Sequence, residues 1–287
     1  MSAPSGTSCI LDKYIITLQN PLADIEPSGT QAVNAITSGT AYAQVVNPKT
    51  KLPKPGVQVR FSVDVVANTG GHDARHSAMR PKGKLLDCRD NTTEVETTIC
   101  ITQLDGRATV TFKAPIVSGT HTIIATCVSP ACTSQASGHI NVKVGGLKTI
   151  PTSPFYRQIG QTDFHLENNY LIPDAATILW RMAAAYHFEA QFKRNGASPP
   201  LLPLNDASLT WGGKFDIHGQ WTTQGGHSEH RRGTVIDIRA NSAAGAISTQ
   251  NFKKFISLAK FFGARAAVHL SGKATQHFHV RLLGRGE

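Results

Sequence analysis

The sequence predicts two domains, an all-β sandwich over residues 1–146 and an α+β domain with a small antiparallel sheet over residues 155–287. Three observations support this prediction. The length of 287 residues exceeds the usual size of a single domain. Short runs rich in Val, Ile and Thr fill the first half, and helical periodicity appears only in the second. The stretch VGGLKTIPTSP between them has the Gly and Pro content of a linker, which we place at 147–154.

The N-terminal domain consists of seven short runs separated by Gly, Pro, Asn and Asp. These runs are ILDKYIITL, TAYAQVVN, VQVRFSVDVVA, TTICITQL, RATVTFKAP, THTIIATCV and GHINVKV. Their composition is typical of β-strands, and seven of them with turn signals between predict a sandwich. The stretch 68–89 interrupts the pattern with His72, His76 and several basic residues. It is either a contact loop or an excursion without function, and no acidic or Cys partner for a metal is convincingly placed beside these histidines.

The C-terminal domain contains two predicted helices. The first runs over 174–192, with Asp174 as its N-terminal cap. A Pro-rich loop and a candidate strand follow it. The second helix covers 248–262 and ends at Gly263. Its expected apolar stripe is Phe252, Phe255, Ile256, Ala259 and Phe262. The segments RAAVHL and HFHVRL flank SGKATQ and predict a β-hairpin.

Two motifs in the C-terminal domain carry residue types that bind metals. They are GHSEHRRGTVIDI at 226–238 and QHFHVRL at 276–282. If both contain strands, alternation turns Asp237 away from its apolar neighbours and puts His277 and His279 on one face. The bend at Gly233 would bring His230 back over the first strand, so His230, Asp237 and His279 can converge if the strands are antiparallel neighbours. Two imidazoles and a carboxylate would leave zinc one open coordination position.

The two motifs resemble the penicillin-insensitive murein endopeptidases, and more broadly the LAS zinc peptidases. The shared signature is His, six residues, Asp and a later His-x-His. The resemblance implies one zinc ion per chain, bound by His230, Asp237 and His279, with His277 as catalytic base or transition-state stabiliser. It also implies a zinc metallopeptidase that hydrolyses the peptide cross-links of bacterial peptidoglycan. Glu229 replaces the usual Ser beside the first ligand, which leaves the substrate open.

Other residues near the motifs are candidates for substrate contacts or for support of the ligands. They are His227, Asp206, Ser208, Arg231, Arg232 and Arg281. A guanidinium can bind a substrate carboxylate through two parallel hydrogen bonds, although each arginine can equally be a solvated surface charge. Two other functions stay open. One is a D-Ala-D-Ala carboxypeptidase or protein peptidase on the same zinc site, and the other is a non-catalytic, zinc-containing adhesion or binding protein.

The N-terminal domain has a resemblance of its own. The segments PGVQVRFSV, DGRATVTFKAP and SGTHTIIATC resemble the bacterial immunoglobulin-like domains of invasin-type surface proteins. The resemblance implies an immunoglobulin-like sandwich that serves as a spacer or as a targeting module.

Charge and hydropathy limit the partners. The net charge is +10, and most of it belongs to the C-terminal half. A basic surface suggests an anionic partner, and we expect bacterial peptidoglycan or another anionic wall polymer. No motif that reads RNA or DNA is present, so nucleic acid is not expected. No apolar run approaches the roughly 18 residues of a membrane helix, so the chain is not expected to span a bilayer. The sequence does not indicate an oligomeric state.

All five cysteines lie in the N-terminal half. Cys88 with Cys100, and Cys127 with Cys132, are spaced to close short loops, which leaves Cys9 as the odd one. Disulfides would indicate an extracytoplasmic location, periplasmic or secreted. The N-terminal segment MSAPSGTSCILDKY does not have the pattern of a signal peptide, so the export route is open.

Overall fold

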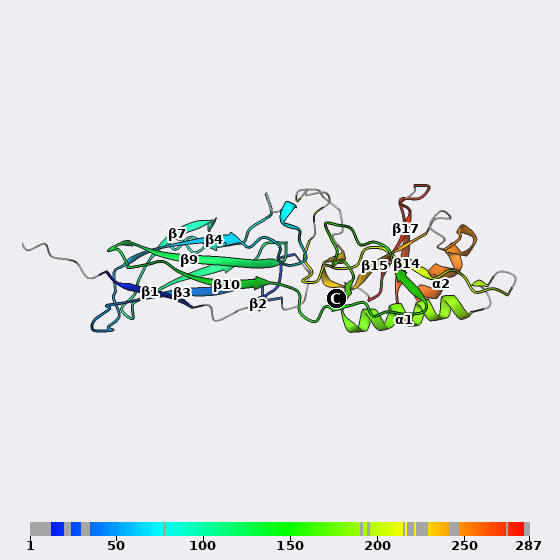
Figure 1. Cartoon of the computed structure of the whole chain (residues 1–287), viewed down its shortest axis with the longest axis horizontal. Helices are drawn as coiled ribbons and strands as arrows, with labels where there is room; N and C mark the ends of the chain where they lie inside the picture. Colours follow the sequence, from blue (N-terminus) through cyan, green and yellow to red (C-terminus); the bar gives the residue numbers. More distant parts are fainter. Residues whose placement is uncertain are drawn as a thin grey trace, which may run out of the picture.

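The structure is a computed structural model that describes residues 13–19, 24–29, 35–76, 79–189, 192–193, 196–214, 216, 221, 229–240, 247–273 and 275–283. Figure 1 shows an elongated molecule with a β-sandwich at one end and a smaller mixed sheet with helices at the other. The described chain is mostly β-sheet with few helices, which confirms the β-rich fold. The division into two domains at a linker stays a prediction.

The N-terminal half is built from two five-stranded sheets. The first has the order β1 (Ile15–Gln19), β3 (Ser38–Val46), β8 (Arg107–Lys113), β5 (Lys84–Leu86) and β6 (Glu94–Val95). The second has the order β2 (Asp24–Ile25), β10 (Ala136–Val142), β9 (Gly119–Ser129), β4 (Gln58–Val65) and β7 (Thr97–Ile101). Each of the seven predicted runs contains one of these strands.

Alternation along the strands produces the core of this half. In β4, Val59, Phe61 and Val63 are buried, whereas Gln58 and Arg60 between and beside them are exposed. Strand side chains point to opposite faces in turn, so each strand gives one apolar row to the space between the sheets. The stretch 68–89 is not a mere excursion, because it contains the short helix η1 (Ala74–His76) and strand β5 of the first sheet.

Two disulfides close short loops of the sandwich. They join Cys88 to Cys100 and Cys127 to Cys132, which confirms the predicted pairs. Cys9 lies outside the described residues. Because disulfides persist in oxidising compartments, the two bonds indicate an extracytoplasmic protein. Among the described residues, no helix has both the length and the apolar character needed to cross a membrane.

The C-terminal half is organised around a five-stranded sheet. Its order is β12 (Tyr156–Gln158), β14 (Leu202–Leu204), β15 (Val235–Arg239), β17 (His277–Arg281) and β16 (Arg265–His269). The sheet is mixed, because β12 runs parallel to β14 while the other pairs are antiparallel. Strand β11 (Lys148–Thr149) lies inside the expected linker and pairs with β13 (Tyr170–Leu171). Part of the expected linker is therefore ordered against the C-terminal half.

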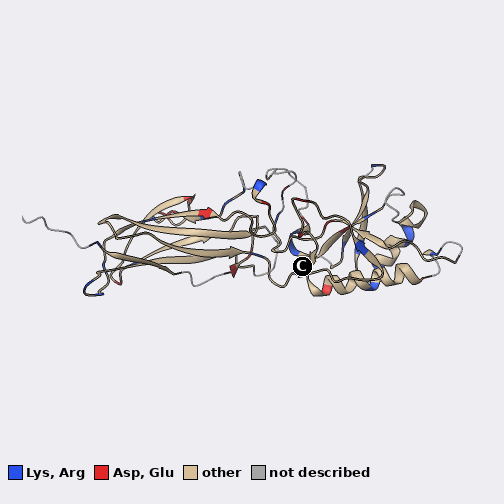
Figure 2. Ribbon diagram, viewed as in Figure 1, with Lys and Arg blue, Asp and Glu red and all other residues tan. Residues whose placement is uncertain are grey.

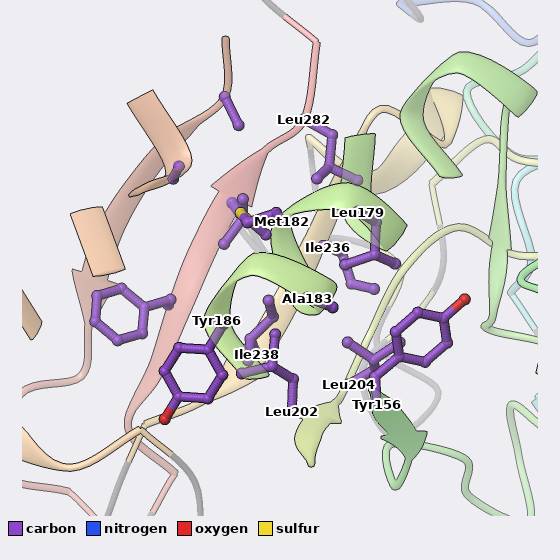
Figure 3. Close-up of a cluster of buried hydrophobic side chains, with 14 of the residues drawn as sticks. Tyr156, Leu179, Met182, Ala183, Tyr186, Leu202, Leu204, Ile236, Ile238 and Leu282 are labelled. Atoms are coloured by element: carbon purple, nitrogen blue, oxygen red, sulfur yellow. The ribbon is translucent and has the colours of Figure 1, made fainter. Parts of the chain in front are cut away.

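Helices α1 (Pro173–Phe188) and α2 (Phe252–Phe261) cover the apolar side of this sheet. Figure 3 shows Leu179, Met182 and Tyr186 of α1 next to Ile236 and Ile238 of β15. All five side chains are nearly inaccessible to solvent. This core holds the central strands in place, so the opposite, polar face of β15 and β17 is held with them.

Two details of the helices differ from the sequence analysis. The cap of α1 is Ile172, and Asp174 lies inside the first turn without a capping hydrogen bond. Its charge there still interacts favourably with the positive end of the helix dipole. In α2, Ile256 is 37% exposed and Leu258 is buried in its place, so the stripe is rotated relative to the expected one.

Candidate metal centre

Strands β15 and β17 bring the two histidine motifs together. They are adjacent and antiparallel, and Asp237 lies directly opposite His279 in their register. Ile236, Ile238 and Phe278 point into the hydrophobic core, so Asp237 and His279 point to the other face. The alternation expected from the sequence is therefore present in both strands.

His230 lies next to Asp237 and His279 because the turn before β15 folds back over that strand. It begins the short helix η3 (His230–Arg232), which ends at Gly233 in the left-handed region with φ of 67°. A Cβ at Gly233 would lie 2.3 Å from a methyl carbon of Leu147, so this tight bend requires glycine. The bend folds His230 over β15, where its Nε2 lies 3.4 Å from Oδ1 of Asp237.

The three side chains form a compact and buried group. One possible ligand atom from each of His230, Asp237 and His279 lies within 4.8 Å of the others. Their exposed fractions are 1%, 4% and 6%. The backbone of Asp237 is fixed on both sides, since its N–H donates to the carbonyl of Asp206 at 2.8 Å and its carbonyl accepts from the N–H of Asn205 at 2.7 Å. Nitrogen and oxygen donors in this arrangement suit a zinc ion.

Hydrogen bonds from the far sides of two imidazoles fix which nitrogen faces Asp237. Nδ1 of His277 lies 2.9 Å from the carbonyl oxygen of Thr275, which can only accept, so Nδ1 carries the proton. In the neutral ring the lone pair is then on Nε2, 3.4 Å from Oδ2 of Asp237. Nε2 of His279 lies 3.2 Å from Glu229, which leaves Nδ1 of His279 facing Asp237 at 2.9 Å. The lone pair of His277 therefore faces a carboxylate, an arrangement that a cation would stabilise.

The acidic side chains of Asp237 and Glu229 are held in their charged forms by their neighbours. Burial alone would raise the pKa of Asp237, but the charge of His230 and the hydrogen bonds of His230 and His279 hold it well below its usual range. Glu229 forms a two-point ion pair with Arg281, whose hydrogen bonds lower the pKa of Glu229 to about 2. Both acidic groups are therefore ionised near neutral pH, and Glu229 can orient His279 in the way that carboxylates orient metal-bound histidines.

The remaining candidates lie in different surroundings. Arg231 donates to the carbonyl of Gly29 in the sandwich at 3.2 Å, and Arg281 is paired with Glu229. Ser208 is completely buried and pairs through its backbone with β13 at Tyr170.

Asp206 accepts hydrogen bonds from the side chains of Asn168 and Asn205, and burial raises its pKa. Arg232 lies in η3. His227 lies outside the described residues. Of the arginine candidates, Arg281 lies beside the candidate metal centre, where it forms an ion pair with Glu229.

Two residues beside the candidate centre are not among the site residues predicted from the sequence. Glu229 was noted only as a departure from a motif, yet it contacts His279 and Arg281. The second is His269 of the segment RAAVHL, which on sequence alone can support the site or be a packed or surface histidine. It lies directly opposite His277 in the hairpin, and its ring stacks on His279 with centroids 4.8 Å apart. The hairpin register could have identified His269, whereas the position of Glu229 depends on a turn that sequence patterns do not specify.

Comparison of the sequence with known proteins finds no relative. No protein family matches the chain, and no curated protein matches it. Among solved structures, an adhesin, InvE, from Yersinia pseudotuberculosis is 12% identical, with a TM-score of 0.36, over 79% of this chain and 69% of its own. A conjugative transposon lipoprotein from Bacteroides eggerthii is 4% identical, with a TM-score of 0.26, over 44% of this chain and 95% of its own. A conjugate transposon protein from Bacteroides vulgatus is 12% identical, with a TM-score of 0.26, over 49% of this chain and 95% of its own.

These findings correct the family drawn from the two motifs. The similar structures named above are an adhesin and two proteins of conjugative transposons, and no family model or curated protein, of a peptidase or of any other kind, matches the chain. The assignment to the murein endopeptidases and the LAS peptidases is therefore wrong, and so is the function of a peptidoglycan hydrolase derived from it. The physical reason is that two short motifs specify ligands and not the fold around them, and similar ligand sets recur on unrelated folds.

Proposed function

We propose that this protein is a non-catalytic, extracytoplasmic binding protein, periplasmic or secreted, with two domains. The C-terminal domain holds one zinc ion that stabilises its sheet. The N-terminal sandwich is the contact module. This is the binding alternative left open by the sequence, and the two separate hydrophobic cores, one in each half, support the division into domains.

The observation that carries the proposal is the presence of a fourth donor. His277 presents the lone pair of Nε2 toward Asp237, beside the three buried ligands His230, Asp237 and His279. Zinc sites with four protein ligands are structural, whereas catalytic sites keep one position for water or substrate. With His277 as a ligand, the coordination of the ion would be complete. The ion would then link η3, β15 and β17.

A structural ion explains why polar side chains are buried here. A buried carboxylate among imidazoles costs free energy unless its charge is compensated. Zinc would compensate Asp237 and fix the turn that begins at His230. Binding energy of this kind adds directly to the stability of the folded state.

The sandwich offers a surface for an anionic partner. A hollow of about 310 Å³ on its outer face is lined by Arg60, Asp87, Arg89, Thr97, Thr98 and Ile99. Arg60 of β4 lies opposite Ile99 of β7, which is 41% exposed. Lys and Arg residues occur at several other places along the described chain (Figure 2). The positive charge of Arg60 on this surface would favour an anionic wall polymer such as peptidoglycan.

Sedimentation of the full chain with purified bacterial cell walls tests this function. We expect retention that falls as salt rises, with no wall fragments released into the supernatant. Arg60→Ala should reduce the retained fraction several-fold. Lys254→Ala removes the same charge from α2 in the other half and should have little effect. Release of peptide fragments by wild type, abolished in His277→Ala, would overturn the non-catalytic function, and retention that does not respond to salt would overturn the anionic partner.

A further inference from the structure

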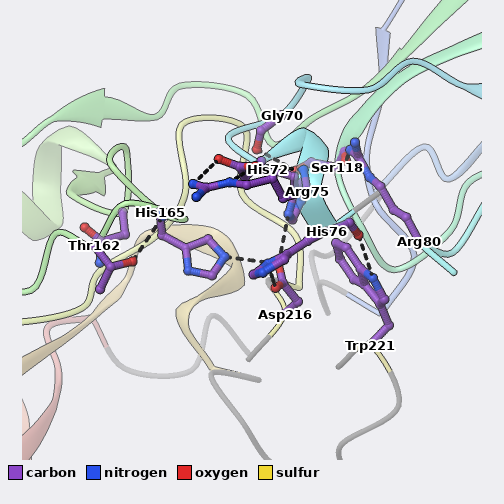
Figure 4. Close-up of polar contacts among 12 residues, drawn as sticks. Gly70, His72, Arg75, His76, Arg80, Ser118, Thr162, His165, Asp216 and Trp221 are labelled. Carbon is purple, nitrogen blue, oxygen red and sulfur yellow. Dashed lines mark hydrogen bonds and ion pairs between the residues drawn. The ribbon is translucent and has the colours of Figure 1, made fainter. Parts of the chain in front are cut away.

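A second histidine and aspartate cluster lies where the sandwich meets the C-terminal half. It consists of His72, His76, His165 and Asp216, which come from three separate segments of the chain. His72 and His76 belong to the loop between β4 and β5, His165 follows β12, and Asp216 follows β14. Figure 4 shows the three rings around the carboxylate of Asp216. The loop histidines, which had no acidic partner in the sequence, find one in the other half of the molecule.

The cluster is deeply buried. The side chains of His72 and Asp216 have no exposed surface, and those of His76 and His165 are 11% and 12% exposed. Nδ1 of His72 lies 3.7 Å and Nε2 of His165 lies 3.1 Å from Oδ1 of Asp216. Ligands bound to one tetrahedral zinc ion at about 2.0–2.2 Å are separated by roughly 3.3–3.6 Å. The two observed separations lie on either side of that range.

His72 provides an independent indication of a ligand. Its Nδ1 is buried and makes no hydrogen bond within the described chain. Its Nε2 lies 3.4 Å from Oγ of Ser118, whose hydroxyl donates to the carbonyl of Gly212 at 2.7 Å. Because that hydroxyl uses its one proton on Gly212, it accepts from Nε2–H of His72. The lone pair of His72 is then on Nδ1, aimed at the carboxylate of Asp216.

His76 and Arg80 also lie beside the cluster. His76 contacts the second carboxylate oxygen, Oδ2, with its Nδ1 at 2.5 Å, and so fixes the orientation of Asp216. Arg80 lies nearby, but its guanidinium donates to the backbone carbonyls of Thr69 and Ser118. Its positive charge is therefore directed to the loop backbone. Carboxylates that bind metals are commonly held in place by a further polar contact, as His76 provides for Asp216.

We propose that His72, His165 and Asp216 bind a second divalent cation, best suited to zinc, that fastens the β4–β5 loop of the sandwich to the C-terminal half. The loop is already seated there by other contacts. Arg75 donates to the carbonyl of Asp163 at 3.0 Å, and the ring of His76 stacks on Phe164 with centroids 4.2 Å apart. Nε1 of Trp221 donates to the carbonyl of His76 at 3.1 Å. These contacts preorganise the ligands, and the ion would make the junction rigid.

Counting zinc in purified full-length variants tests this site separately from the one between β15 and β17. In an Asp237→Asn background, which disables the first site, we expect one equivalent of zinc per chain. Adding His72→Gln or, as a second and less buried change, His165→Gln should reduce this to none. His139→Gln alters an exposed histidine of β10 and should leave the count unchanged. Circular dichroism and intact disulfides establish that each variant is folded.

The results separate the two sites. If the first site binds no zinc, wild type and Asp237→Asn both hold one equivalent, and His72→Gln still removes it. Replacement of zinc by cobalt should give a visible spectrum in Asp237→Asn that disappears in Asp237→Asn with His165→Gln. The proposal is overturned if Asp237→Asn is free of zinc, or if folded protein carrying His72→Gln and His165→Gln keeps its zinc.

Discussion

The two histidine and aspartate clusters of this molecule are alike in composition but differ in what holds them. The cluster of His230, Asp237 and His279 is built on neighbouring strands over a single hydrophobic core. The cluster of His72, His165 and Asp216 exists only when the sandwich loop lies against the C-terminal half. Substitutions in the first cluster should therefore change the stability of the C-terminal half. Substitutions in the second should change how the two halves are joined.

The largest expected effect is loss of the carboxylate in the first cluster. Asp237→Asn removes the charge that faces the imidazoles of His230, His277 and His279, so zinc affinity at this centre should fall by more than about 100-fold, beyond the loss typical of an outer-sphere partner. In the presence of zinc this corresponds to roughly 2.7 kcal/mol of lost stabilisation. Calorimetric titration of the chelator-treated protein measures the affinity. Unchanged binding would show that the centre does not hold the ion.

Loss of the carboxylate in the second cluster should loosen the sandwich loop and not the C-terminal sheet. Asp216→Asn removes the carboxylate charge that the rings of His72, His76 and His165 face, and loss of the partner of a buried polar group costs about 1–3 kcal/mol. We expect backbone amides of residues 70–76 to exchange with deuterium about 10-fold faster, since 1.4 kcal/mol corresponds to a factor of ten. Zinc binding at the first cluster should be unchanged. Exchange that rises equally throughout the C-terminal sheet would contradict the separation of the two clusters.

The smallest expected effect is that of Glu229→Gln, which separates a supporting residue of the first cluster from a ligand. Glu229 contacts His279 from the side away from Asp237 and is partly exposed. Glu229→Gln keeps the shape of the side chain but weakens its orienting contact, so zinc affinity should fall by about 10-fold. Titration alongside Asp237→Asn compares the two variants. A loss as large as that of Asp237→Asn would make Glu229 a ligand and not a support.

The difference between the clusters also explains what the sequence could predict. The first cluster was predictable because strand alternation places Asp237 and His279 on one face and because both motifs are short and local. The seven strand runs and both disulfides were predictable for the same local reasons. The stretch 68–89 was harder to interpret, because strand β5 within it is only three residues long.

Local sequence patterns could not predict the second cluster. His72 and Asp216 lie far apart in the sequence, and their contact depends on how two halves with separate cores are packed. The family drawn from the motifs was wrong because the same few ligand residues can be placed on many folds. The role of His277 also depended on a contact with the carbonyl of Thr275 that alternation alone does not show.

The number and type of zinc ligands in the first cluster test the account most directly. X-ray absorption at the zinc edge should be measured on the Asp216→Asn protein, in which only this cluster holds the ion. We predict four nitrogen and oxygen neighbours at about 2.0–2.2 Å, with the outer-shell pattern of three imidazoles and no exchangeable water. A spectrum with two imidazoles and a bound water, or protein that takes up no zinc, would contradict the account.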